Sequence, residues 1–231
     1  MEEIYKEITL ILDILKSIEE FNEWLNQRRE RKQILSFGDE HEHFKKEIEN
    51  KTIHEIMNIF QERINKIQLS DEEECCPLNG ILITTNQCLN CNIETTQSTS
   101  PMFLTIKRNF LTQIDCVQKA IVSFLEAHYC SLKQCQICKK DLMVINEYLF
   151  EPQILCVELS NLNVSLNINK KITINGKKYE CIGVVAKRNN SLFSCKKINN
   201  QWIYSSNEFN SVIETDDVQF TFFKKIPLYS E

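Results

Sequence analysis

The chain has few glycines and prolines and no long apolar run. Four Gly and four Pro among 231 residues argue against a low-complexity or disordered protein. No apolar stretch approaches the roughly 18 residues that a membrane-spanning helix needs, so no membrane partner is expected. The N-terminal stretch MEEIYKEITLILDILKSIEE has no positive segment and no small-residue cleavage site, and acids interrupt its apolar residues. We therefore expect an intracellular protein, cytoplasmic or nuclear.

An excess of positive charge is also missing. The chain has 27 Lys and Arg against 32 Asp and Glu, which gives a net charge of −5 and a pI of about 5.6. Nucleic-acid-binding domains usually show a basic patch or a high pI, so nucleic acid is not an expected partner. The one basic run, RRERK at residues 28–32, lies in a helical pattern and is interpreted as a solvated helix face.

Cysteine, in contrast, is abundant. In a reducing compartment, eleven cysteines indicate metal ligands and core residues rather than disulfides. Two Cys-x-x-Cys pairs, Cys88 with Cys91 and Cys135 with Cys138, are separated by 43 residues. Each pair can form a tight knuckle, and together they would supply four thiolates to one structural zinc ion with no open coordination position. Because the intervening segment is long, the ion would join the tips of two hairpins.

The alternative for any of these four residues is a buried free thiol, since free cysteine is common in protein cores. A neighbouring His128 or Cys130 could also replace one ligand, because both lie close to the second pair. The seven remaining cysteines are expected in the core or at strand ends: Cys75, Cys76, Cys116, Cys130, Cys156, Cys181 and Cys195.

Helical spacing of apolar residues predicts one amphipathic helix over 4–26, a second over about 41–68 and a third over 113–128. The acidic run at 70–74 is interpreted as a linker or turn. Asn175-Gly176 predicts a hairpin turn, because both residues tolerate positive φ. Helices followed by a cysteine-bearing β region and a mostly antiparallel sheet predict an α+β fold. Strands are expected at 80–88, 92–100, 101–108, 143–150, 153–160, 179–187, 191–197, 201–206 and 218–225.

In this order, several segments resemble the ubiquitin-specific proteases, the papain-like deubiquitinases with thumb, fingers and palm. The two cysteine pairs carry the most specific part of the resemblance, which covers roughly residues 45–226. It implies one domain over 1–231, with a helical thumb-like part at 1–74, zinc-bearing fingers at 75–150 and an antiparallel palm at 151–231. The similar segments are TIHEIMNIF, PLNGILITTNQCLNC, CSLKQCQICKK, FEPQILCVELS, YECIGVVAKRNNSLFSCKKINNQWIYSSNEF and VQFTFFKK.

The departures from the family concern its catalytic residues. The nucleophile motif Gly-Asn-Thr-Cys-Tyr has no counterpart, and no cysteine precedes Cys75. Leu192 stands where the resemblance places the catalytic histidine, and the group that orients it would fall near Ser205, Ser206 or Asn207. Thiol proteolysis needs a base, and leucine cannot accept a proton.

No other Cys–His pair replaces these residues. Three of the four histidines, His41, His43 and His54, are interpreted as solvated or structural, and the fourth is the His128 named above. Cys195 should point to the opposite side of its strand from Leu192.

We therefore expect a pseudoenzyme that acts as a scaffold or protein-interaction subunit in a complex, as inactive relatives of this fold do. The alternatives are a non-catalytic binder of ubiquitin or of the small ubiquitin-like modifier and, less favoured, an active deubiquitinase. Phe21 and Trp24, on the apolar stripe of the first helix, are a candidate partner surface. The competing interpretation is that this stripe packs on the chain's own core.

Overall fold

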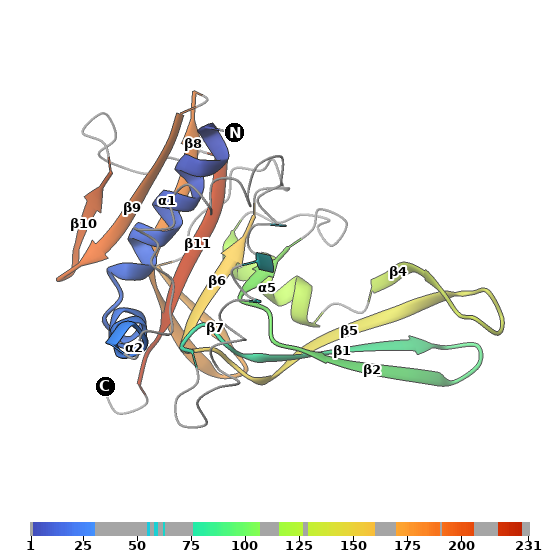
Figure 1. Cartoon of the computed structure of the whole chain (residues 1–231). Helices are drawn as coiled ribbons and strands as arrows, with labels where there is room; N and C mark the ends of the chain where they lie inside the picture. The colour runs from blue at the N-terminus through green and yellow to red at the C-terminus, as the bar shows by residue number, and fades with distance from the viewer. Residues whose placement is uncertain are drawn as a thin grey trace.

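The computed structural model of the chain describes residues 2–30, 55, 58–59, 62, 76–106, 116–126, 129–159, 170–189, 191–205 and 217–227. These residues form two β-sheets with helices on the larger one (Figure 1). None of the helices in these ranges is long and apolar enough to cross a membrane.

The larger sheet, called the main sheet below, has seven strands. Its pairings are antiparallel except for one parallel pair between its last two strands, β6 and β3. In spatial order the strands are β10 (Gln201–Tyr204), β9 (Ser191–Ile198), β8 (Lys177–Arg188), β11 (Asp217–Lys225), β6 (Ile154–Glu158) and β3 (Phe103–Thr105), and β7 (Lys171–Ile174) pairs with β8.

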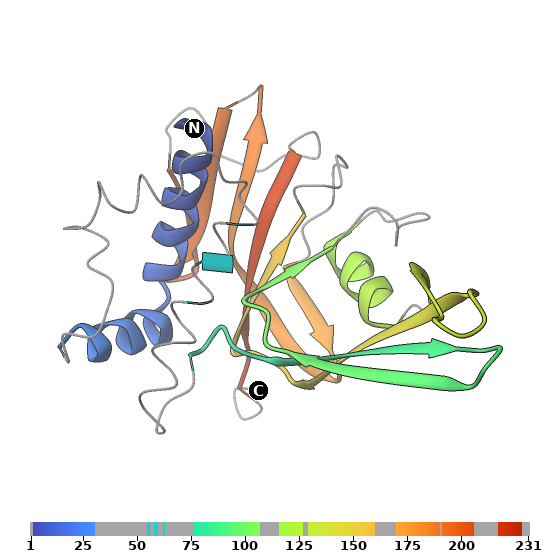
Figure 2. The same cartoon turned by 45° about the vertical axis from the view of Figure 1, so that its right-hand side comes forward.

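The smaller sheet, called the fingers sheet below, has four antiparallel strands and projects from the rest of the molecule as a long arm (Figures 1 and 2). In spatial order they are β2 (Ile93–Thr99), β1 (Ile81–Cys88), β5 (Asp141–Phe150) and β4 (Tyr129–Gln134). Two hairpins, β1–β2 and β4–β5, lie side by side because β1 pairs with β5 in the middle.

The predicted helix 4–26 is wrong in its continuity, because two helices stand there, α1 (Glu2–Lys16) and α2 (Glu19–Glu30). Ser17 makes the break. Its hydroxyl and its amide both donate to the carbonyl of Ile14, at 2.6 and 3.0 Å, so this carbonyl has a local partner in place of the next helical turn. The chain can then turn and direct the apolar side chains of α2 toward the core.

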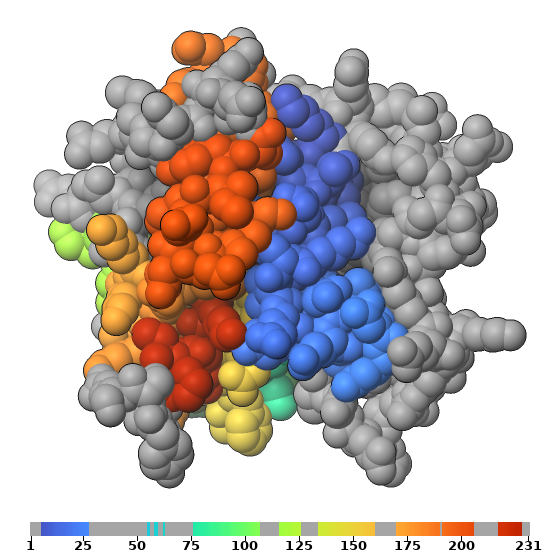
Figure 3. Space-filling view, turned by 90° about the vertical axis from the view of Figure 1, so that its left-hand side faces the viewer, coloured from blue at the N-terminus to red at the C-terminus, as the bar shows by residue number. Residues whose placement is uncertain are grey.

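Helix α1 lies directly on one face of the main sheet (Figure 3). Its apolar residues recur at helical spacing and are buried together with apolar residues of α2 and of the main sheet. Close approach is possible because β8 has Gly183 at this place. A Cβ added there would come within 2.5 Å of Cγ2 of Ile14.

Two ion pairs join the helices to the sheet at its exposed margin. Lys196 of β9 reaches Asp13 of α1 at 2.8 Å, and Lys224 of β11 reaches Glu20 of α2 at 2.6 Å. Ion pairs that solvent reaches in this way typically stabilise a fold by about 0.2–1 kcal/mol. Burial of apolar side chains therefore holds the helices in place.

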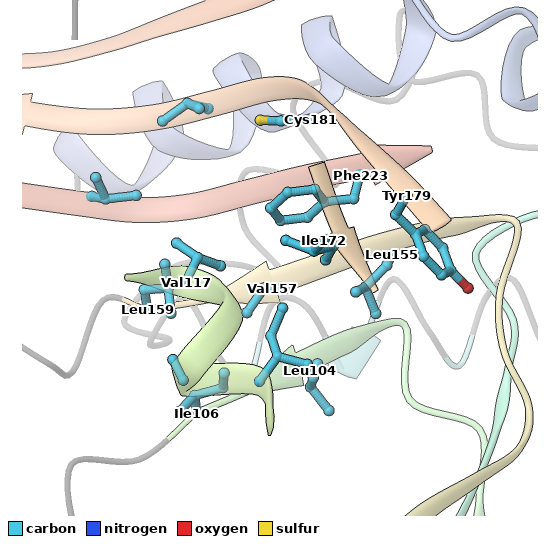
Figure 4. Close-up of a cluster of buried hydrophobic side chains, with 14 of the residues drawn as sticks. Leu104, Ile106, Val117, Leu155, Val157, Leu159, Ile172, Tyr179, Cys181 and Phe223 are labelled. Carbon is cyan, nitrogen blue, oxygen red and sulfur yellow. The ribbon is translucent and has the colours of Figure 1, made fainter. Parts of the chain in front are cut away.

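The other face of the main sheet is covered by α5 (Val117–Glu126), the counterpart of the helix predicted at 113–128. Figure 4 shows side chains of α5, β6 and β11 gathered there, including Val117, Val157 and Phe223. Polar contacts fix the helix at both ends. Gln118 bonds both backbone groups of Thr173 in β7, and a fingers side chain, Asn146, donates to the carbonyl of Phe124.

The mixed α+β texture and the predicted strands are confirmed where the structure describes them. The predicted turn is also confirmed, with φ of 48° at Asn175 and 76° at Gly176. Strand β4 was not predicted. Helix 41–68 lies mostly outside the described residues, although its four described positions are helical. The subdivision at 74 and 150 stays a prediction, and β3 and α5 of the predicted fingers segment pack with the main sheet instead.

Candidate metal centre and the divergent palm motif

The four cysteines of the two Cys-x-x-Cys pairs meet at the tip of the fingers sheet. Cys88 is the last residue of β1 and Cys91 lies in the β1–β2 turn, whereas Cys135 and Cys138 both lie in the β4–β5 turn. The antiparallel register of β1 and β5, which sets Gln87 opposite Met143, places these two turns at the same end of the sheet. All four Sγ atoms lie within 4.8 Å of one another, and those of Cys88 and Cys138 are 3.5 Å apart.

These distances fit a tetrahedral metal site. With metal–sulfur bonds of about 2.3 Å, the sulfur atoms of a tetrahedral zinc site stand about 3.8 Å apart. Small side-chain movements would bring the four sulfurs to that spacing. Because the protein supplies all four ligands, no position remains for water or substrate, and the ion would be structural.

The backbone has the same feature in both turns. The residue directly after the second cysteine has positive φ, 54° at Asn92 and 60° at Lys139. In the second turn the Lys139 amide donates to the Cys135 carbonyl at 2.9 Å, and the Cys135 amide donates to the Lys140 carbonyl at 2.8 Å. Asparagine tolerates the left-handed region better than lysine, so the second turn carries more backbone strain.

Backbone amides at the second turn also favour thiolates. The Lys140 amide lowers the pKa of the Cys138 thiol to about 6. The amides of Cys138 and Ile137 lower the pKa of Cys135 in the same way. Cys91 shows the opposite direction, because its hydrogen bond to Cys138 raises its pKa to about 12. A thiol that keeps its proton and donates it to a neighbouring thiolate is expected where four cysteines gather without a cation between them.

The remaining described cysteines lie away from this tip. Four of them are buried in the apolar clusters on the two faces of the main sheet, as predicted: Cys76, Cys156, Cys181 and Cys195. Cys116, just before α5, is only half-buried. Burial raises the pKa of Cys156 and, to about 12, that of Cys181, so these thiols are inert at neutral pH. The proposed alternative ligands, His128 and the side chain of Cys130, lie outside the described residues, as does Cys75.

Leu192 lies inside an apolar core. It is the second residue of β9, opposite Lys187 of β8, and its side chain is 6% exposed in the cluster beneath α1 and α2. Cys195 belongs to the cluster on the opposite face, as the alternation along a strand predicted. The face that the resemblance would assign to the base is therefore occupied by packed hydrocarbon.

Ser205 stands where an orienting group was expected, and it has a structural contact. Its hydroxyl accepts the amide of Ser194 at 2.9 Å, and its own amide donates to the Ser194 carbonyl. Ser206 and Asn207 lie outside the described residues. All four histidines do so too, so the expectation that none pairs with a cysteine stays a prediction.

The prediction that Phe21 and Trp24 form an exposed partner surface is wrong, because both side chains are buried. Phe21 and Trp24 are 5% and 4% exposed, and their rings contact each other at a tilt of 30° with centroids 5.8 Å apart. Both belong to the cluster that joins α1, α2 and the main sheet. The stripe therefore packs on the chain's own core, where burial removes its apolar side chains from water.

Comparison with known proteins gives structural likeness only. No protein-family profile and no curated protein matches the sequence. A SAGA DUB module of Ubp8, Sgf11, Sus1 and Sgf73 bound to monoubiquitin matches with a TM-score of 0.55 and 16% identity, over 77% of this chain and 49% of that chain. A yeast SAGA DUB module with an Sgf73 variant matches with a TM-score of 0.57 and 15% identity, over 77% and 51%.

A further module of the same four proteins, bound to ubiquitin aldehyde, matches with a TM-score of 0.52 and 17% identity, over 77% of this chain and 50% of that chain. The chain thus spans about half the length of the chains it matches. At such low identity the likeness concerns the fold and carries no activity with it. The chain therefore has a fold like that of the ubiquitin-specific proteases, with four cysteines gathered at the tip of its fingers.

Proposed function

We propose that the protein is a catalytically inactive ubiquitin-specific-protease-like protein that acts as a scaffold or interaction subunit in a protein complex. One observation carries this proposal. Leu192, at the position that the resemblance assigns to the catalytic histidine, is packed in the apolar cluster beneath α1. A thiol protease needs a base beside its nucleophile, and a leucine enclosed by hydrocarbon leaves no room for water or an imidazole to serve as one.

The fingers support a structural role. Cys88, Cys91, Cys135 and Cys138 would hold one zinc ion, which favours tetrahedral thiolate sites. The ion would clamp two hairpins that otherwise share one strand pairing, and so stabilise an arm that projects from the main sheet. A chain that keeps such an arm while its palm motif diverges is suited to contacts with other proteins.

The similar solved structures are complexes of several proteins, which favours protein partners for this chain as well. The SAGA DUB modules that match are assemblies of Ubp8 with Sgf11, Sus1 and Sgf73. For this chain we propose membership of a complex, inside the cell and in the cytoplasm or the nucleus. A reducing compartment would keep its zinc thiolates from oxidising.

The second candidate function is non-catalytic binding of ubiquitin or of the small ubiquitin-like modifier. It is favoured by two of the matched modules, which are bound to monoubiquitin and to ubiquitin aldehyde. A fold that retains the fingers and the main sheet could hold a modifier without cutting it.

Three measurements on zinc-loaded protein separate these functions. A fluorogenic ubiquitin substrate and a thiol-reactive ubiquitin probe should give no turnover and no adduct, with an active deubiquitinase as positive control. Adding the chain to isotope-labelled ubiquitin or modifier should leave their NMR spectra unchanged if the chain is only a scaffold. If it binds the modifier, the signals of residues on one contiguous surface of the modifier should shift. Purification of the tagged chain from its own cells at native level should yield a few stoichiometric partners.

Turnover that is lost when the cysteines outside the zinc site are replaced would overturn the inactive assignment. Modifier conjugates without stoichiometric partners would replace scaffolding with the second function.

A further inference from the structure

Strand β2 forms one edge of the fingers sheet, and it is longer and more regular than the other sheet edges in the described part of the chain. β10 and β3 are edges of four and three residues. β4 is irregular, with a register shift between Cys130 and Gln134, and the outer side of β7 is bonded by Gln118. β2 is seven residues long and pairs with β1 without interruption, from Cys88 opposite Ile93 to Leu82 opposite Thr99. Short length, bulges and covering are common ways to protect an edge, and β2 uses none of them.

Charge does not protect this edge either. All seven residues of β2 are exposed, and only Glu94 among them is charged. The whole hairpin from Ile81 to Thr99 contains no other charged residue, in a chain of which 26% is charged. Lysine and proline, the side chains that most often block edge pairing, are absent from the strand. An exposed, regular and nearly uncharged edge presents its backbone N–H and C=O groups to another strand.

We propose that β2 is the interface through which two copies of this chain associate, by antiparallel pairing of β2 with β2 about a two-fold axis at Thr96. This register is self-complementary. It sets Ile93 opposite Thr99, Glu94 opposite Ser98, and Thr95 opposite Gln97. No like charges face each other, and the axis joins two threonines, a favourable cross-strand pair. The contact uses the same patch on both copies and closes as a dimer.

The shape of the molecule permits this contact. β2 runs along the outer edge of the fingers arm, and the arm projects away from the main sheet and its helices (Figures 1 and 2). Two arms lying side by side would form one continuous sheet of eight strands. A single seven-residue strand pair is smaller than the roughly 1,200–2,000 Å² of a stable interface, so the dimer is weak and depends on concentration.

Sedimentation and light scattering on the zinc-loaded chain, from low micromolar to several hundred micromolar, measure this association. Thr96→Lys and Thr96→Glu each place like charges on the axis and should weaken association about fivefold. An equimolar mixture of the two variants opposes unlike charges and should restore it. Thr85→Lys is the matched control, because Thr85 is the neighbour of Thr96 on β1 and lies one strand inside the edge. Zinc content and circular dichroism confirm that each variant is folded.

A concentration-dependent dimer that both Thr96 variants weaken, that their mixture restores and that Thr85→Lys leaves intact supports the proposal. A wild-type chain that stays monomeric throughout overturns it, even if the chain is a scaffold for other proteins. Equal weakening by Thr85→Lys, failure of the mixture to recover, or open-ended assembly also overturns it, because each excludes a closed β2 pair.

Discussion

At Gly183 of β8 helix α1 comes close to the backbone of the main sheet, and replacing this glycine should disturb the contact. A Cβ at this position meets Ile14 of α1, with Cγ2 at 2.5 Å and Cδ1 at 3.3 Å. Carbon atoms prefer about 3.5–4.0 Å, so Gly183→Ala must push the helix away or force Ile14 from its rotamer. The contact lies in the cluster that also encloses Leu192, so the substitution tests that enclosure.

The magnitude follows from two opposing effects. Overpacking a core costs about 1–3 kcal/mol. Replacing glycine by alanine in extended backbone returns about 0.4–1 kcal/mol, because the unfolded chain loses freedom. We expect Gly183→Ala to lower the free energy of unfolding by about 1–2 kcal/mol. Ile14→Ala alone should cost about 2–5 kcal/mol, since it leaves a cavity beneath α1.

The double variant Ile14→Ala with Gly183→Ala tests whether the two side chains meet. With Ile14 shortened, the new Cβ occupies space that the isoleucine left, so the losses should add to less than their sum by about 1–2 kcal/mol. Urea unfolding of zinc-loaded protein, followed by circular dichroism, gives all four free energies. Gly176→Ala is the matched control: it costs about 1–2 kcal/mol through its left-handed backbone and has no atom within 4 Å of the new Cβ. It should be additive with Ile14→Ala. If Gly183→Ala were equally additive, α1 would not lie on Gly183.

Three further outcomes are expected. Cys135→Ser should abolish stoichiometric zinc binding and lower the melting temperature, whereas the control Cys181→Ser, which changes a core thiol, should keep the zinc. Elemental analysis measures the zinc and calorimetry the melting temperature. A wild-type zinc content in Cys135→Ser would refute the ligand assignment. Acidification should release the metal, because protons compete with the ion for the four thiolates; release should come below pH 6, since the Lys140 amide already lowers the pKa of the Cys138 thiol to about 6 and a bound cation keeps its ligands deprotonated to lower pH. A chromophoric chelator follows the release, and metal retention that does not depend on pH would contradict the assignment. Leu192→His should cost about 2–4 kcal/mol by burying a polar ring, and it should give no turnover of a fluorogenic ubiquitin substrate because the nucleophile motif is also missing; turnover by this variant would show that a working nucleophile remains and would refute its loss.

The two cysteine pairs of the candidate metal site were the clearest signal in the sequence. Two Cys-x-x-Cys pairs determine two knuckles through local geometry alone, and the separation of the pairs indicates two hairpins. The turn at Asn175-Gly176 is local in the same sense, because two adjacent residues that tolerate positive φ specify it. The stretch from Ile81 to Thr99, whose one charged residue is Glu94, was visible too, but its meaning depends on which strand lies at the edge.

Helical spacing was a weaker guide to packing. It located the apolar stripe of Phe21 and Trp24 and left two interpretations open, a partner or the chain's own core. The structure places both side chains in the core, because the break at Ser17 turns α2 toward the main sheet. A side-chain hydrogen bond to one carbonyl is not part of a hydrophobic periodicity, so the pattern predicted one helix.

The sequence by itself determined the cysteine pairs, the hairpin turns and the strand-rich order, since each depends on residues near one another in the chain. Only the tertiary structure decided that β1 and β5 bring the two knuckles together, that Leu192 lies under α1, and that β2 is an exposed edge. Those features depend on contacts between residues tens to more than a hundred positions apart, as with Ile14 and Gly183. Local propensity does not encode such contacts; they form when distant apolar surfaces bury one another.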